Sequence, residues 1–213
     1  RCPPNGVDRV NPEPAKGPRT WRRRCRSFCR DSGGGAERMM LHLARGFLER
    51  GLEVDLVLSR IEGPYVDDIP DCVRVVGLDA GKAPGYAALG SLLPLRSYLN
   101  DARPDALLSA MSRVNVVAVA ATRLSSTRPR VVVSERNHLS SYVAGSDRPG
   151  MRALPLLVHA AYPFADAVVP NSEGVADDLA ATARLDRTSM TVINNPTVAP
   201  EIAEQAAEPV NHE

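Results

Sequence analysis

Apolar and polar residues follow one another along most of this chain in a repeated order of strand and helix. The clearest helical pattern covers residues 36–50, and Gly51 follows it where a left-handed C-terminal cap is expected. Short apolar runs at 53–59, 73–78, 105–109, 130–134, 165–169 and 190–193 predict strands. Helical patterns lie between them at 87–102, 114–124, 151–162 and 173–183. This order predicts a single α/β domain, a Rossmann-like parallel sheet with helices on both faces.

In a parallel sheet of this kind, ligands bind at the carboxyl ends of the strands. Polar residues gather at several of the predicted strand ends. They form the glycine loop at 33–35, the serines at 109–112, the polar run at 134–138 and the junction at 171–173. These segments are the candidate site.

The glycine loop consists of Gly33, Gly34 and Gly35 and leads directly into the first helix. Glycines allow backbone to approach a ligand closely, and the free amides of a helix start favour an anion such as phosphate or pyrophosphate. Glu37 lies in the first turn, where a carboxylate complements the helix dipole. An ordinary glycine-rich turn remains the alternative. The spacing is not GxGxxG, which disfavours a nicotinamide oxidoreductase, and no Walker motif occurs.

The run 134–138 offers four consecutive functional side chains after its serine. Glu135 supplies a carboxylate, Arg136 a guanidinium suited to phosphate, Asn137 an amide and His138 an imidazole. A solvated loop with an internal Glu–Arg pair is the alternative. Asn171 and Ser172 precede the last helix, where ordinary capping explains them as well as binding does. His159 lies in an apolar helix, so we expect a hydrogen-bonded core histidine.

Composition narrows the class of protein further. The 213 residues are 44% apolar and 24% charged, as in an ordinary globular protein. No run approaches the roughly 18 apolar residues that span a bilayer, and no apolar signal core begins the chain, so we expect a cytoplasmic protein. Residues 1–30 hold nine Arg or Lys against two acids, a basic arm suited to acidic lipid or nucleic acid. The spacing of Cys25 and Cys29, with no nearby histidine, predicts no metal site.

With these elements in place, residues 33–210 resemble the N-terminal domain of the family 4 retaining glycosyltransferases, which have the two-domain GT-B architecture. The resemblance depends on the order and spacing of several short motifs. These are Gly-Gly-Gly-Ala-Glu-Arg at 33–38, Arg-Pro-Asp at 103–105, Ser-Glu-Arg-Asn at 134–137, Asn-Ser-Glu-Gly-Val-Ala-Asp-Asp-Leu at 171–179 and Val-Ile-Asn-Asn-Pro at 192–196.

The resemblance implies the parts that each motif plays. In the family this domain holds the acceptor, often a lipid-linked sugar, and the other domain holds most of the nucleotide-sugar. The glycine loop, with Glu37 and Arg38, would face the donor phosphates across the cleft. The acceptor side would be lined by Glu135, Arg136, Asn137, His138, Asn171 and Ser172, and the hinge would lie at Asn195 and Pro196. Donor phosphate itself assists the acceptor hydroxyl in this family, so no protein nucleophile, cofactor or metal is expected.

The same resemblance predicts the surroundings of the enzyme. The partners would be a nucleotide-sugar and a glycan or lipid-linked acceptor, with peripheral contact to the inner face of a membrane and no nucleic acid. A second expectation concerns residues 197–213, which are similar to a truncated linker towards an absent C-terminal domain. We therefore expect residues 33–196 to form the domain and the fragment to be inactive alone. The alternatives are a non-catalytic binding module with a basic N-terminal arm or, less favoured, a nicotinamide oxidoreductase.

Residues 1–32 depart from the family, which has an apolar first strand at the centre of the sheet directly before the glycine loop. This chain is irregular and Arg-rich there, so the first central strand is expected to be missing and the fold marginally stable. With Arg taken as CGN, Cys as TGY, Ser as TCN and Phe as TTY, residues 24–33 read from the third base of each codon become an apolar run that ends in a Pro- or Gly-containing turn. We therefore interpret residues 1–32 as an out-of-frame translation that rejoins the native frame within the glycine codons.

Overall fold

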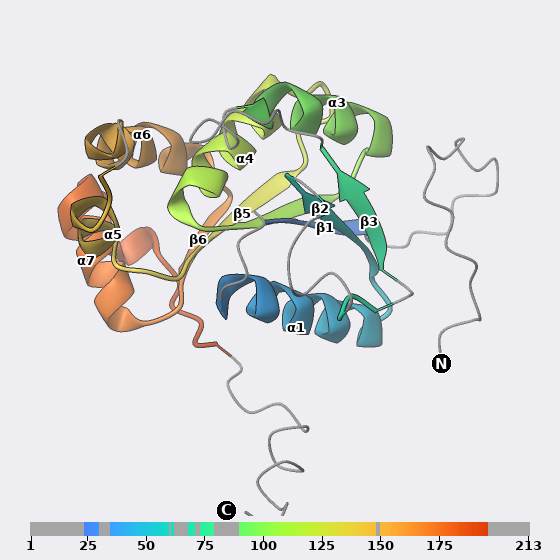
Figure 1. Ribbon diagram of the computed structural model, residues 1–213, viewed down its shortest axis with the longest axis horizontal. Coiled ribbons are helices and arrows are strands. Elements are labelled where there is room, and N and C mark those ends of the chain that lie inside the picture. Colours follow the sequence, from blue (N-terminus) through green and yellow to red (C-terminus); the bar gives the residue numbers. More distant parts are fainter. Residues whose placement is uncertain are drawn as a thin grey trace, which may run out of the picture.

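Six parallel strands form one sheet in a computed structural model that describes residues 24–29, 35–59, 61, 68–70, 73–78, 90–147 and 150–195. The strand order is β3-β2-β1-β4-β5-β6, so the chain starts near the middle, moves to one edge and then to the other (Figure 1). This confirms the predicted α/β fold with a parallel sheet. The strands are β1 Arg24–Cys29, β2 Glu53–Leu58, β3 Arg74–Gly77, β4 Ala106–Ala110, β5 Arg130–Glu135 and β6 Ala167–Pro170.

Helices cover both faces of this sheet. Helix α1 lies on one face, and α3 and α4 lie on the other, while α5, α6 and α7 gather around the β6 end (Figure 1). The helices are α1 Gly35–Glu49, α3 Leu92–Ala102, α4 Ser112–Leu124, α5 Leu139–Ala144, α6 Leu154–Ala161 and α7 Glu173–Ala183. Three 3-10 turns join them at Met151–Ala153, Tyr162–Phe164 and Arg187–Ser189.

Two apolar clusters hold the layers together. The larger packs α3, α4, α6 and α7 onto the sheet around side chains such as Leu99, Leu107 and Val158, all fully buried. The smaller packs α1 onto the other face through Met40 and Leu41. Helix α1 ends as its pattern predicts, because Gly51 has φ +75° and its amide donates to the Leu48 carbonyl at 2.8 Å.

The expectation that the first central strand is missing is wrong. The backbone of β1 pairs with β2 on one side and with β4 on the other, in the register Cys25 to Val54 and Cys25 to Ala106. The physical reason is that β2 and β4 would otherwise present unpaired amides and carbonyls to the same gap, and backbone of any sequence can pair with them. The reason given for marginal stability therefore does not hold. Residues 1–23 and 30–34 lie outside the described part of the chain.

Three local predictions need correction. Residues 190–193 add one bridge between Met190 and Val168, with Thr191 and Ile193 donating to β6 carbonyls, but they form no strand. Helix α5 was missed because it has only six residues, too few for the helical spacing of Leu139, Tyr142 and Val143 to stand out. His159 is exposed rather than in the core, but it has the expected hydrogen-bond partner, because its Nδ1 lies 2.9 Å from the carbonyl oxygen of Ala183 at the end of α7.

Candidate functional site at the carboxyl edge of the sheet

The strand order fixes where a ligand is expected to bind. The chain leaves β1 for a helix on one face and leaves β4 for a helix on the other, so the carboxyl ends of these two strands form the switch point of the sheet. Of the glycine loop, Gly33 and Gly34 lie outside the described residues. Gly35 is the first residue of α1 and is exposed, and Arg38 is exposed one turn later. The side chain of Glu37 is likewise not among those that the structure describes.

The turn after β4 has an unusual backbone. Met111 has φ 79° and ψ 131°, a region that residues with a side chain rarely adopt. Its amide donates to the Ser134 carbonyl at 3.2 Å, and its own carbonyl accepts the first bond of α4 from the Asn115 amide at 2.8 Å. The Asn137 amide group lies 3.8 Å from the Met111 sulfur. The strained turn is therefore tied to the end of β5.

Beneath this edge lies a buried carboxyl group. Glu135 is 1% exposed and accepts hydrogen bonds from the Tyr162 hydroxyl, from Asn115 Nδ2 at 3.0 Å and from Ser112 Oγ at 3.0 Å. Asn115 is the centre of the network, because its Nδ2 also lies near the Ser134 carbonyl while its Oδ1 accepts from Ser109 Oγ at 2.8 Å. These bonds connect β4, α4, β5 and the turn after α6.

Glu135 has no basic partner among the described ion pairs. Burial raises the pKa of its carboxyl group to about 7, against the hydrogen bonds from Tyr162, Asn115 and Ser112, which lower it. Burial, together with the charge of Glu135, also raises the pKa of the Tyr162 hydroxyl. Because its side chain is enclosed, Glu135 faces the interior rather than the edge where a ligand would lie. Its hydrogen bonds tie the end of β5 to α4 and to the turn after α6.

Sequence reasoning missed Asn115 and Tyr162, the two partners that make this network. A signal was present, since Asn115 is the one amide among the mostly apolar buried residues of α4. A buried amide requires hydrogen-bond partners, and that requirement points to a polar group on a neighbouring element.

Arg136 is the next residue, and its side chain lies at the surface of the edge. It is half-buried, and Nη1 donates to Asn195 Oδ1 at 2.6 Å. Asn171 follows the end of β6. Its side-chain Nδ2 lies 3.4 Å from the Arg136 carbonyl oxygen, and its backbone N–H donates to the Glu135 carbonyl at 3.0 Å. The structure thus brings together the predicted acceptor residues Arg136 and Asn171 with the predicted hinge residue Asn195. Pro196 lies outside the described residues.

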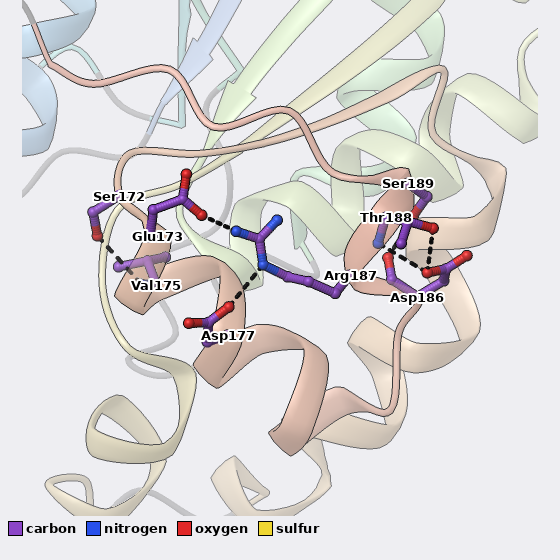
Figure 2. A network of polar contacts seen from close by, with 8 residues as sticks. All are labelled: Ser172, Glu173, Val175, Asp177, Asp186, Arg187, Thr188 and Ser189. Carbon is purple, nitrogen blue, oxygen red and sulfur yellow. Dashed lines mark hydrogen bonds and ion pairs between the residues drawn. The ribbon is translucent and has the colours of Figure 1, made fainter.

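His138 and Ser172 have structural contacts of their own. The Ser172 Oγ accepts from the Val175 amide at 3.2 Å and caps α7, as capping chemistry predicts (Figure 2). His138 Nδ1 lies 4.0 Å from Asp178 Oδ1, and Asp178 also accepts hydrogen bonds from Ser140. Burial would raise the pKa of Asp178, but the Ser140 hydrogen bonds and His138 lower it.

Figure 2 shows a second cluster on α7, beyond the capping residue. Arg187 reaches back from the last 3-10 turn and pairs with both Glu173 and Asp177, the latter through Nε at 2.8 Å. Hydrogen bonds from Thr188 lower the pKa of Asp186, which caps this turn. This cluster fastens the segment after α7 to the helix and leaves Glu173 engaged in an ion pair.

The part of the chain that the structure describes contains no group of His, Cys, Asp and Glu side chains that could hold a metal ion. Within the same residues, no helix is both long enough and apolar enough to cross a membrane.

A Rossmann-like domain with its polar groups at the carboxyl edge is the fold that forms each half of GT-B glycosyltransferases. Residues 34–196 match the family model described as glycosyl transferase 4-like domain, and the chain belongs to this family. No curated protein sequence matches significantly.

Solved structures show the same fold at low sequence identity. The chain is similar to the lipopolysaccharide outer core galactosyltransferase WaaB, with TM-score 0.61 and 12% identity over 81% of this chain and 46% of that one. It is similar to HepE of Anabaena, solved in complex with UDP and glucose, with TM-score 0.62 and 17% identity over 86% and 50% of the chains. It is also similar to sucrose-phosphate synthase of Thermosynechococcus elongatus, with TM-score 0.62 and 13% identity over 88% of this chain and 53% of that one. The chain spans about half the length of these proteins.

Proposed function

We propose that residues 33–196 are the acceptor-side domain of a retaining sugar transferase. The parent enzyme would transfer a sugar from a nucleotide-sugar to a glycan or a lipid-linked acceptor. The observation that supports this is the family match, which begins at the glycine loop and ends at the predicted hinge, the two places where a second domain would face this one.

The proposed roles come from the family resemblance, combined with the contacts of those residues that the structure describes. Backbone amides of Gly33, Gly34 and Gly35, with Arg38 near the helix start, would bind donor phosphate. The residues proposed to contact the acceptor are Arg136, Asn137, His138 and Asn171, and those proposed to position them are Glu135 and Ser172. Glu135 is enclosed and cannot reach a sugar carbon, which supports a reaction assisted by donor phosphate rather than by a protein nucleophile.

The outer face of α6 supports a membrane-bound acceptor. Leu156, Leu157 and Phe164 are 71%, 50% and 54% exposed. Residues 148–165 contain no acid, and the Arg123 guanidinium lies 4.9 Å from the centre of the Phe164 ring. An apolar face flanked by arginines is complementary to a bilayer surface with anionic lipid. We propose that α6 makes peripheral contact with such a surface.

A transfer assay tests the function. The purified chain is incubated with a panel of labelled nucleotide-sugars and with saccharide or lipid-linked acceptors, alone and together with a donor-side domain of a family member. We expect acceptor binding by the chain and transfer only when a donor-side domain is present. Turnover by the chain alone would overturn the requirement for a second domain. Binding of a nicotinamide dinucleotide, with no sugar transfer under any condition, would instead favour an oxidoreductase.

A further inference from the structure

The Arg136 guanidinium is charged and half-buried, and no carboxylate lies within ion-pair distance of it among the described residues. Its Nη1 bonds to the neutral Asn195 amide, while its Nε is enclosed and has no hydrogen-bond partner. Burial lowers the pKa of Arg136 from a value so high that the group stays charged near neutral pH. By contrast, Arg187, which follows α7, is paired with two acids. An enclosed, uncompensated guanidinium is complementary to phosphate.

A second incomplete polar group lies beside it. Asn171 uses Nδ2 on the Arg136 carbonyl, and its Oδ1 is buried without a hydrogen-bond partner. An enclosed carbonyl oxygen without a partner lowers the stability of the fold, and a hydroxyl donor from a ligand would remove this penalty. The 11-residue helix α7 begins two residues later, so its positive end adjoins the same place.

We propose that these two groups form a subsite for a phosphorylated sugar, with phosphate on the Arg136 guanidinium and a sugar hydroxyl donating to Asn171 Oδ1. The proposal rests on the proposed function, since it names the substrate class of the same site. A neutral saccharide would satisfy Asn171 but leave the guanidinium uncompensated, and inorganic phosphate would do the reverse. The phosphate can belong to the acceptor, as in a lipid-phosphate sugar, or to the donor nucleotide.

Asn195 occupies the position that the phosphate would take. Its Oδ1 is a neutral acceptor on Nη1, and the neighbouring Nε is enclosed, so an anion that binds Nη1 would take the place of this oxygen. Asn195 lies at the end of the segment that runs beside β6, where the hinge is predicted. Ligand binding would therefore release this segment from Arg136.

Titration followed by NMR tests the subsite with four probes: a hexose 1-phosphate, inorganic phosphate, a neutral methyl hexoside and UDP. We expect the hexose 1-phosphate to bind at least tenfold more tightly than inorganic phosphate or the hexoside. Arg136→Gln should remove this binding, whereas Arg187→Gln is the matched control and should retain it. Asn171→Ala should weaken the hexose 1-phosphate to the level of inorganic phosphate. Asn195→Ala should tighten the phosphate probes several-fold, a gain that a misfolded variant cannot imitate.

The outcomes separate this proposal from the proposed function. Equal binding of all probes by the Arg136→Gln and Arg187→Gln variants would overturn the subsite, as would a hexoside that binds as tightly as its 1-phosphate. Transfer to an acceptor without any Arg136-dependent phosphate binding would leave the function standing and remove the subsite. Arg136-dependent binding of hexose 1-phosphate without any transfer would support the subsite and contradict the proposed function. Competition by UDP would assign the phosphate to the donor, and competition by a short-chain lipid-phosphate sugar would assign it to the acceptor.

Discussion

The Tyr162 hydroxyl donates a hydrogen bond to the Glu135 carboxyl group inside the core, between residues that lie 27 positions apart in the chain. Tyr162 belongs to the turn after α6, and Glu135 ends the strand that leads into the candidate site. The bond therefore links the helix layer around β6 to the edge of the sheet. Its strength depends on whether Glu135 carries a charge, which makes the link sensitive to pH.

The first prediction concerns stability against pH. Because the pKa of Glu135 is raised from 4.5 to about 7 on folding, the folded state binds the proton more tightly than the unfolded state. The contribution of this group is therefore fully present below pH 4.5 and is lost as pH rises through 7, by about 3 kcal/mol at most. Urea denaturation from pH 4.5 to 8 measures it as the difference between the native chain and Glu135→Gln, in which the amide keeps the shape. Asp178 and Asp186 are present in both proteins, so their contributions to the pH dependence cancel in this difference. A difference that is constant with pH would contradict the raised pKa.

Removal of the Tyr162 hydroxyl should also change the stability in a way that depends on pH. In Tyr162→Phe, Glu135 loses a hydrogen bond that lowers its pKa, and Asn115 loses one acceptor. We expect the free energy of unfolding to fall by about 1–3 kcal/mol, more at pH 8 than at pH 5, because the charged carboxylate depends more on its donors. Denaturation at both pH values measures this. An equal loss at both pH values would show that the contribution of the hydroxyl does not depend on the charge of Glu135.

The next prediction separates capping from ligand binding at Ser172. Ser172→Ala removes the acceptor for the Val175 amide and should lower the free energy of unfolding by about 1 kcal/mol. Ser172→Asp retains a capping oxygen and should restore most of it. Ser141→Ala, at an exposed position in α5, is the control for a lost hydroxyl. A loss of acceptor binding in Ser172→Asp with full stability would assign Ser172 to the site as well as to the cap.

How far the sequence predicts the structure depends on how local each interaction is. Helix α7 has the predicted bounds, 173–183, because a capping serine and an apolar period both lie within it. Five predicted strands, which became β2 to β6, are correct to within about two residues because each contains a short apolar run, whereas 190–193 forms no strand and β1 was not expected. The direction of Glu135 was partly readable, since the alternation of a strand puts it on the same face as the buried Val131 and Val133. Its partners Asn115 and Tyr162 were not readable, because they come from elements 20 and 27 residues away whose packing no local pattern specifies.

The proposed membrane surface predicts selective binding to vesicles. The chain should cosediment with vesicles that contain about a third phosphatidylglycerol and much less with pure phosphatidylcholine, because Arg123 and Arg152 flank the apolar face. Leu156→Glu with Leu157→Glu should abolish the binding without loss of stability, since both side chains are exposed. Ile193→Glu, 58% exposed in another part of the chain, is the matched control. Dimerisation through the same leucines in the absence of lipid, with no vesicle binding, would contradict the proposal.

The last prediction concerns the coding DNA around β1. The structure needs a strand at Arg24–Cys29, between β2 and β4, yet the sequence there is Arg-Cys-Arg-Ser-Phe-Cys, unlike the continuous apolar run expected of a central parallel strand. With the codons assumed above, the reading frame that starts at the third base of each codon gives an apolar run over residues 24–33, and the family match begins at residue 34. We therefore expect the shifted frame upstream of the glycine codons to be open and to encode this strand. A chain that carries the shifted sequence should unfold at a higher denaturant concentration. Its free energy of unfolding should be larger by more than about 2 kcal/mol, the scale for burying one large apolar side chain. Stop codons or a run of charged codons in that frame would show instead that the Arg-rich strand is native.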